Sequence, residues 1–171
     1  MTGARFIVKN DKKLDSINKN GIDKIEFMLS ANPGEAEKPL IKVASGGEIS
    51  RIMLAIKTVL INVEEFDCVI FDEIDAGIGG ITANKVAEKL KCISKTKQTI
   101  CITHLAQIAA IGDYHLSVRK YIQGETTYAK IKNLNSNERI EELAKMIGGG
   151  KDYQVSLDLA KQLISVNKAK N

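Results

Sequence analysis

Two short apolar runs constrain the fold of this chain more than any other feature of its sequence. The first, CVIFDE at Cys68–Glu73, ends abruptly in acids, and the second, QTICITH at Gln98–His104, is rich in β-branched residues. A helix-like segment, TANKVAEKLKCISK, separates them. This alternation is typical of a βαβ unit with a buried parallel sheet. We therefore predict an α/β fold with Cys68–Asp72 and Ile100–Thr103 as neighbouring parallel strands, flanked by helices.

The segments before this unit predict two strands, a loop and a helix. Arg5–Asn10 and Lys24–Ala31 have strand character and are joined by turn residues NKNG, and Asn32–Pro39 is expected to be a loop. A glycine pair then precedes a helix whose apolar residues recur at steps of three and four. This expected core face consists of Ile49, Ile52, Met53, Ile56, Val59, Leu60 and Val63.

The segments after the unit predict a hairpin and two further helices. The hairpin would turn near Gly124. Asn135 and Glu138 have capping-box spacing at the start of the next helix, which ends at glycines. A last helix is expected over Tyr153–Val166.

The composition is that of an ordinary globular domain. The 171 residues are 44% apolar and 27% charged, with a formal net charge of +4. This charge permits a nucleic-acid partner without arguing for one. No run approaches the roughly 18 apolar residues of a membrane span, and the first residues lack the apolar core of a signal peptide. We therefore expect no membrane partner.

The three cysteines lie in or beside apolar runs and have no CxxC spacing. Their odd number and positions predict reduced, buried thiols at Cys68, Cys92 and Cys101. Cys101 and His104 are three residues apart, but no second pair of ligands accompanies them, so zinc is not expected.

Polar residues follow each apolar run at the edge where ligands of open α/β sheets bind. Asp72 and Glu73 have the pattern of a Walker B strand, in which the aspartate holds Mg²⁺ and a following glutamate can deprotonate water. Taken alone, the pair is explained equally well by a strand that ends in surface acids. His104 could donate a hydrogen bond to a phosphate, although a structural histidine at a strand end is the simpler alternative.

The glycine pair lies at the start of a helix, where unpaired N–H groups and the helix dipole favour an anion. Gly46 and Gly47 would let a phosphate approach the backbone, and Ser45 adds a hydroxyl donor. A glycine-rich turn in which Ser45 merely caps the helix is an equal alternative.

The order of these motifs, SGGE, then FDE, then TH, resembles that of the ABC-type ATPases. That resemblance implies that Glu73 is the base acting on water, that Asp72 holds Mg²⁺ through water, and that His104 contacts the γ-phosphate. ATP and Mg²⁺ are the implied cofactors. The signature motif would contact the ATP of a second head in trans, and its residues here are Ser45, Gly46, Gly47 and Glu48. Asp75 would be the D-loop residue at the dimer interface.

The branch of the family is narrowed by SGGEISR, because transporter subunits read LSGGQ followed by QR. The stretches NPGEAEKPLIKVASGGEISRIMLAIK, IFDEIDAGIGG, CITHLAQIAAIGDYH and RIEELAKMIGG resemble the SMC-like DNA-repair ATPases of bacteria over nearly the whole chain. Two departures are small: Ala106 stands where proline is frequent, and Ile49 replaces leucine.

The phosphate-cradling Walker A motif, G-x-x-x-x-G-K-[ST], does not occur in this sequence. GGGKD at Gly148–Asp152 is a decoy, since it follows a helix and lacks the hydroxyl residue. Residues 1–171 are therefore expected to form a single incomplete lobe of an ABC-type ATPase head. By resemblance, the Walker A motif belongs to an N-terminal lobe reached through a coiled coil, and the isolated chain should be inactive.

The resemblance implies Mg²⁺-dependent ATP hydrolysis by a head-to-head homodimer that acts on DNA in recombinational repair of double-strand breaks. The location would be cytoplasmic and nucleoid-associated. Two alternatives remain at this point. The chain could be a fragment of the ATP-binding subunit of an ABC transporter, or a non-catalytic interaction module.

Overall fold

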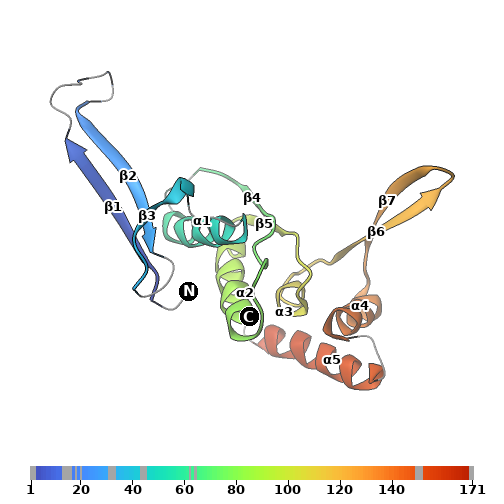
Figure 1. Cartoon of the computed structure of the whole chain (residues 1–171). Coiled ribbons are helices and arrows are strands. Elements are labelled where there is room, and N and C mark those ends of the chain that lie inside the picture. The colour runs from blue at the N-terminus through green and yellow to red at the C-terminus, as the bar shows by residue number, and fades with distance from the viewer. Residues whose placement is uncertain are drawn as a thin grey trace.

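A computed structural model describes residues 3–12, 17, 19, 21–30, 34–42, 46–61, 63, 65–148 and 152–169. In chain order the elements are β1 (Arg5–Lys12), β2 (Asp23–Ser30), β3 (Lys38–Pro39), the 3₁₀ helix η1 (Leu40–Lys42), α1 (Gly46–Leu60), β4 (Cys68–Phe71), α2 (Gly80–Ser94), β5 (Gln98–Cys101), α3 (Ala106–Ala109), β6 (Leu116–Gln123), β7 (Thr126–Asn133), α4 (Ser136–Gly148) and α5 (Tyr153–Ala169). Figure 1 shows them as an elongated row, with the N-terminal sheet at one end and α4, α5 and the β6–β7 hairpin at the other.

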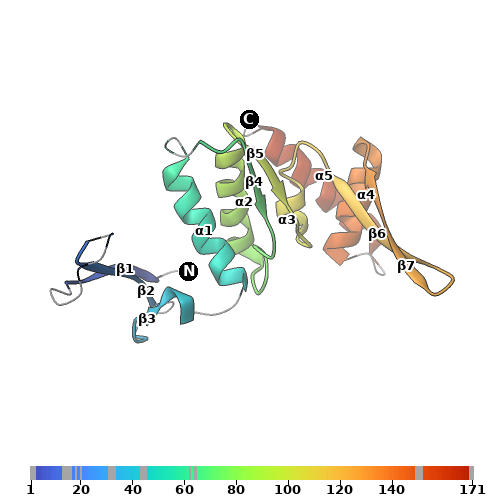
Figure 2. The same cartoon turned by 90° about the horizontal axis from the view of Figure 1, so that it is seen from above.

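The predicted βαβ unit forms the middle of the molecule. Strands β4 and β5 pair in parallel, with Cys68 opposite Gln98 and Phe71 opposite Cys101. Helix α2 is the crossover between them, and α1 lies beside α2 in Figure 2. Ile74 and Ile93 are fully buried in the core that these elements share. The α/β class and the parallel neighbours are thus confirmed, although the strands outside this pair are antiparallel.

The expectation of a buried parallel sheet holds on one face of the pair and fails on the other. Ile70 of β4 and Ile100 of β5 are 63% and 43% exposed, and Ile102 just beyond β5 is 57% exposed. The described helices cover one face of the pair, and the alternation of a strand leaves the other residues uncovered. For the same reason the thiol of Cys68 is exposed, and Cys92 is exposed on α2, so the prediction of buried thiols failed at both positions.

Helix α1 also differs from its predicted form. It begins at Gly46, so the glycine pair is its first turn rather than the loop before it. Its buried residues are Gly47, Ile52 and Leu54. The predicted core face is largely exposed, since Val59 and Val63 are 80% and 76% exposed. Periodicity identified an apolar stripe but not the neighbour that would cover it.

The N-terminal strands form a separate antiparallel sheet in the order β1-β2-β3. Arg5 pairs with Ser30, and the rings of Phe6 and Phe27 stack with their centroids 5.6 Å apart. The end of the predicted loop is the short edge strand β3, a position that tolerates proline. Of the NKNG turn, Asn18 and Asn20 lie outside the described residues.

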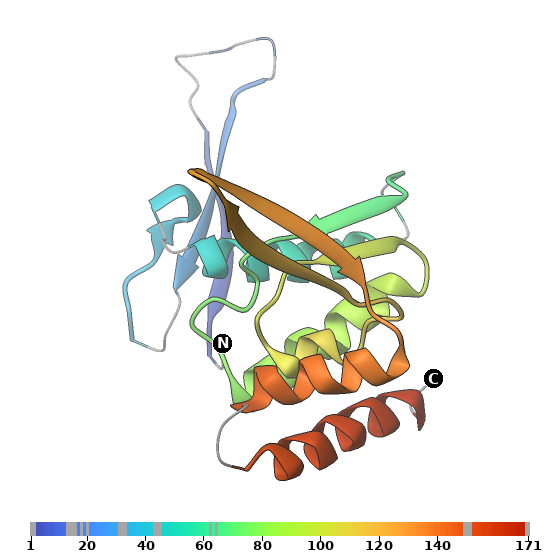
Figure 3. The same ribbon diagram turned by 90° about the vertical axis from the view of Figure 1, so that its right-hand side faces the viewer.

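The C-terminal elements agree with the predictions. Strands β6 and β7 form the hairpin, and Gly124 adopts φ +64 at its turn. The capping box is confirmed, because Asn135 Oδ1 accepts from the Glu138 amide at 3.0 Å and Glu138 Oε2 accepts from the Asn135 amide at 3.1 Å. Figure 3 shows α4 and α5 packed side by side, around a second core that contains Leu143 and Ala160. The final helix extends to Ala169. Gly148, the first residue of the decoy segment, ends α4, and residues 149–151 of that segment lie outside the described residues.

None of the helices in the described ranges has both the length and the apolar character needed to cross a membrane.

Candidate functional site

The carboxyl ends of β4 and β5 meet at one edge of the parallel pair. Asp72 and Glu73 follow β4, and Thr103 and His104 follow β5. The Ile102 amide donates to the Phe71 carbonyl at 2.9 Å and so continues the parallel register beyond the assigned strands. The sequence-predicted acids and histidine are therefore brought to the same edge of the sheet.

Asp75 joins the two strand ends. Its Oδ2 accepts hydrogen bonds from Thr103 Oγ1 at 2.6 Å and from the His104 amide at 2.8 Å. His104 Nδ1 lies 3.0 Å from the same oxygen, and Asp75 is only 3% exposed. Burial raises the pKa of Asp75, but the hydrogen bonds from Thr103 and His104 outweigh it, so the pKa is lowered overall. The carboxylate is thus a buried anion that is held by the segment after β5.

The contact with Asp75 also orients His104. Because Nδ1 faces the carboxylate, Nε2 is the ring nitrogen available to a ligand. The side chain of His104 is 71% exposed. Sequence reasoning placed Asp75 at a dimer interface; within the chain, its carboxylate contacts Thr103 and His104.

Glu73 begins a tight turn whose backbone is unusual. It has φ +54, in the left-handed region that non-glycine residues seldom adopt, and the Ala76 amide donates to its carbonyl at 3.1 Å. The turn brings the Glu73 carboxylate against the start of α1. A Cβ built on Gly46 would lie 2.6 Å from Glu73 Oε2. Gly46 therefore leaves room for the carboxylate of its own chain.

Gly47 is buried against the next residues of the same turn. A Cβ there would lie 2.8 Å from the Ala76 Cβ, 2.9 Å from the Ala76 carbonyl oxygen and 3.0 Å from Arg51 Nη1. Contacts within the chain thus favour glycine at both positions, in addition to any contact with a phosphate. Ser45 lies outside the described residues, and Glu48 is in the first turn of α1.

Sequence reasoning missed two side chains of α1 that reach the acidic turn. Ser50 Oγ donates to the Asp72 carbonyl at 2.9 Å. Arg51 Nη1 donates to the Ala76 carbonyl at 2.8 Å and approaches the Ile74 carbonyl at 3.4 Å. The signal was present in the ISR that follows SGGE, where a serine and an arginine share the helix face of Gly47.

Asp72 could supply one ligand to Mg²⁺. It is exposed, and its Oδ1 accepts from the Glu73 amide at 2.9 Å. Mg²⁺ commonly takes one or two carboxylates and completes its shell with water and substrate phosphates, so a single aspartate fits that donor set. Among the described residues there is no group of three or more His, Cys, Asp or Glu suited to a metal.

Cys101 lies close to the site but has the wrong chemistry for a metal or a nucleophile. Burial, together with the charges of Asp75 and Asp72, raises the pKa of its thiol to about 12. A thiol with that pKa stays protonated at neutral pH, whereas metals and electrophiles require the thiolate.

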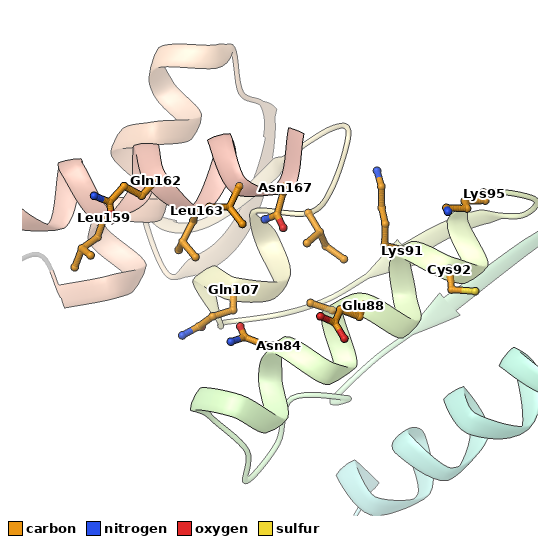
Figure 4. Close-up of a pocket in the computed structure, with 13 residues that line it drawn as sticks. Asn84, Glu88, Lys91, Cys92, Lys95, Gln107, Leu159, Gln162, Leu163 and Asn167 are labelled. Carbon is orange, nitrogen blue, oxygen red and sulfur yellow. The ribbon is translucent and has the colours of Figure 1, made fainter. Parts of the chain in front are cut away.

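A groove of about 470 Å³ lies elsewhere, between α2 and α5 (Figure 4). Lys91, Gln107 and Leu163 are among the residues that line it. Asp72, Glu73 and His104 do not line it, so the groove is distinct from the site at the strand ends.

Solved structures define the class of fold. An Smc head domain from Pyrococcus yayanosii is 23% identical with a TM-score of 0.57, over 83% of this chain and 25% of that one. An Smc head bound to the C-winged helix domain of ScpA is 25% identical with a TM-score of 0.51, over 78% of this chain and 38% of that one. The chain has the fold of part of an SMC ATPase head.

Sequence relatives identify the family within that class. DNA repair protein RecN of Treponema pallidum is 50% identical over 144 residues, or 84% of this chain and 25% of the relative. RecN of Bacillus subtilis is 40% identical over 148 residues, and RecN of Haemophilus influenzae is 37% identical over 97% of this chain. The chain belongs to the RecN family, and it spans about a quarter of the length of the curated relatives it matches. No family model matches it.

Proposed function

We propose that this chain is the C-terminal half of a RecN ATPase head, which binds and hydrolyses ATP with Mg²⁺ when two heads meet. The observation that carries the proposal is the Asp75 carboxylate, which links the segment after β4 to His104. The curated relatives are named DNA repair proteins, and one similar structure comes from work on ATP-driven dimerisation and DNA-stimulated activation of SMC ATPases. The names of the relatives support a role in DNA repair, and recombinational repair of double-strand breaks is the form of that role implied by the resemblance.

Each residue at the strand ends has a role in this proposal. Glu73 accepts the proton of the attacking water, Asp72 holds Mg²⁺ through water, and Nε2 of His104 contacts the γ-phosphate. Mg²⁺ bound to the triphosphate supplies charge neutralisation at the transferred phosphoryl group. Asp75 keeps the His104 ring oriented for this contact.

The Walker A lobe is proposed to cover the bare face of β4 and β5. Ile70, Ile100 and Ile102 are exposed there, and β5 and β6 belong to separate two-stranded sheets in the described chain. Val118 and Ile131 pair on one exposed face of the hairpin. These apolar surfaces support a large interface with a second lobe, since exposed apolar patches mark interaction sites.

The start of α1 is proposed to meet the ATP of the second head. The signature residues that the resemblance implies for this contact are Ser45, Gly46, Gly47 and Glu48. A bulky residue at Gly47 would not test this contact, because it would first strike Ala76 of its own chain. Ser45→Arg is the better variant. It should prevent head dimerisation while leaving nucleotide binding to each head.

DNA binding and a cytoplasmic, nucleoid-associated location belong to the same proposal. They rest on the names of the bacterial relatives. The observations favour this reading over the transporter subunit, since the named relatives are repair proteins. They also favour it over a non-catalytic module, since the acids and histidine converge.

The experiment compares this chain alone with a head completed by the N-terminal segment of a RecN relative. The chain alone should show little binding of Mg-ATP by calorimetry, because the Walker A lysine and amides supply most phosphate contacts. The completed head should hydrolyse ATP. Glu73→Gln should lower kcat by about 10²–10⁴-fold and accumulate a nucleotide-bound dimer in sedimentation.

Glu125→Gln, at the exposed tip of the hairpin, is the matched control and should keep full activity. Tight, stoichiometric binding of Mg-ATP by the isolated chain would contradict the half-site proposal. An unchanged kcat in Glu73→Gln would show that Glu73 is not the base that accepts the proton of water.

A further inference from the structure

Ser50 and Arg51 lie one turn into α1, and none of the roles proposed above falls to them. In an α-helix, residues three and four apart share a face, so Gly47, Ser50, Arg51 and Leu54 point the same way. Gly47 and Leu54 are buried, which shows that this face packs on the rest of the chain. The polar groups of Ser50 and Arg51 are therefore directed inward.

Their partners are backbone carbonyls of the acidic turn. Ser50 Oγ donates to the Asp72 carbonyl, and Arg51 Nη1 donates to the Ala76 carbonyl, at 2.9 and 2.8 Å. Within the described chain, Arg51 Nε is buried without a hydrogen-bond partner. Burying a guanidinium in this way is unfavourable unless its remaining contacts compensate. The arrangement indicates a side chain fixed by the turn carbonyls.

The turn that Arg51 holds is itself strained. Glu73 has φ +54, and such a conformation persists only when the surroundings determine it. The fully buried Ile74 fixes the turn from the core side, and Arg51 fixes it from the α1 side. Gly47 leaves room for the Arg51 side chain to reach the turn, since a Cβ on Gly47 would lie 3.0 Å from Arg51 Nη1.

The same turn carries Asp75 between the two carbonyls that Arg51 approaches. Those carbonyls, on Ile74 and Ala76, face α1, whereas the Asp75 carboxylate faces Thr103 and His104. A shift of α1 would therefore move the turn, and with it the anion that orients His104.

We infer that Arg51, assisted by Ser50, is a positioning residue that couples the start of α1 to His104 through the turn 73–76. The inference deepens the proposed function, on which it rests, because that function gives the start of α1 a phosphate to sense. Arg51 reaches both carbonyls through the single atom Nη1, so a lysine ammonium could donate to the same carbonyls but would lack the rest of the planar guanidinium and would replace Arg51 only in part.

The test uses amide hydrogen exchange of the full 171-residue chain, followed by NMR. The His104 amide reports the position of Asp75, to which it donates, and the Ile102 amide reports the strand pair through its bond to Phe71. Arg51→Met should speed exchange at His104 by about tenfold and leave Ile102 within about twofold. Arg51→Lys should restore part of the protection. Lys89→Met, an exposed cation on α2, should change neither amide.

Ser50→Ala is the milder second variant and should speed exchange at His104 by a smaller factor. It keeps the inference testable if Arg51→Met does not fold. Unchanged exchange at His104 in these variants would overturn the coupling. Equal acceleration at His104 and Ile102 would also overturn it, because Arg51 would then stabilise the whole unit and not the turn.

Activity of the completed head provides an independent measurement. Arg51→Met should lower kcat by about tenfold to a hundredfold with little change in KM for ATP, because misplaced catalytic groups slow the chemical step. A raised KM at unchanged kcat would contradict a positioning role. If the unaltered head shows no hydrolysis, the proposed function fails, whereas the exchange experiment still decides the coupling.

Discussion

At the scale of single residues, the site depends on one buried anion. Asp75 is 3% exposed, and its carboxylate is held by Thr103 and His104 of the segment after β5. A buried carboxylate is costly unless it is hydrogen-bonded, and Thr103 supplies the shortest of these bonds. Thr103 is thus as important to the geometry as the histidine beside it, because its hydroxyl also accepts from the Leu105 amide at 3.0 Å.

Thr103→Val tests this dependence through pH. The pKa of Asp75 is lowered in the folded chain, so its contribution to stability is present above the unfolded pKa of about 3.9 and is lost as pH falls through the folded value. The variant loses a hydrogen bond to a charge, so its unfolding free energy at pH 6 should fall by about 1.5–3 kcal/mol.

The difference from the unaltered chain should narrow in urea unfolding at pH 3, where the unfolded carboxyl is protonated and the charge contributes less. Thr127→Val on the exposed strand β7 is the control and should be nearly neutral at both pH values. If Thr103→Val lowers the unfolding free energy by the same amount at pH 6 and pH 3, then packing, and not the charge of Asp75, accounts for the lost stability.

At the scale of elements, α1 and the turn after β4 are fitted closely to each other. Gly46 faces the end of a flexible side chain, the Glu73 carboxylate, whereas Gly47 faces the backbone and Cβ of Ala76. A flexible side chain can move away from a new methyl group, but a backbone carbonyl in a fixed turn cannot do so cheaply. The two glycines therefore differ in what they tolerate.

Alanine at each position should show this difference. Gly47→Ala should lower the unfolding free energy by about 1–3 kcal/mol, as overpacked sites do. Gly46→Ala should stay within about 1 kcal/mol of the unaltered chain, because Glu73 can move and alanine favours the helix. Urea unfolding measures both. Gly79→Ala is the matched control, since a Cβ there meets nothing within 4 Å. Equal unfolding free energies of Gly46→Ala and Gly47→Ala would show that the turn at Ala76 can move to accept the new methyl group.

Much of the order of helices and strands could be predicted from the sequence. Where the predictions failed, the reasons are physical. The strand ends placed Asp72, Glu73 and His104 together, because parallel strands share their carboxyl edge. Periodicity could show that α1 is amphipathic, but it could not show which stripe would be covered. The ISR pattern placed Arg51 on the helix face of Gly47, but its role was missed because its partners are backbone carbonyls, which the sequence pattern does not identify.

At the scale of the whole molecule, the described chain exposes apolar surfaces that a second lobe could cover. The bare face of β4 and β5 carries Ile70 and Ile100, and Val59 extends an uncovered stripe on α1. Figure 1 shows β4 and β5 separated from the hairpin, with no strand of the described chain between them. The proposed N-terminal lobe would supply the missing cover.

Ile100→Lys tests that cover. Ile100 is 43% exposed, so the variant should change the stability of the chain alone by about 1 kcal/mol or less. It should weaken association with the N-terminal segment of a RecN relative by roughly a hundredfold, because an unpaired ammonium would be buried in the interface. Calorimetry measures the affinity. Ile81 on α2 is 77% exposed, and the control variant Ile81→Lys should bind the N-terminal segment normally. If both variants weaken binding equally, the interface lies elsewhere.

The separate N-terminal sheet has a consequence for how cooperatively the chain unfolds. Among the apolar residues of β1, β2 and β3, Leu29 is the one that is buried, and it belongs to neither of the two core clusters. Opening this sheet exposes little new apolar surface. The free energy of opening it is therefore lower than the free energy of unfolding the central unit. The chain should therefore melt as at least two cooperative units. A probe placed on Phe6 would report the weaker unit, and one placed near Phe71 would report the stronger.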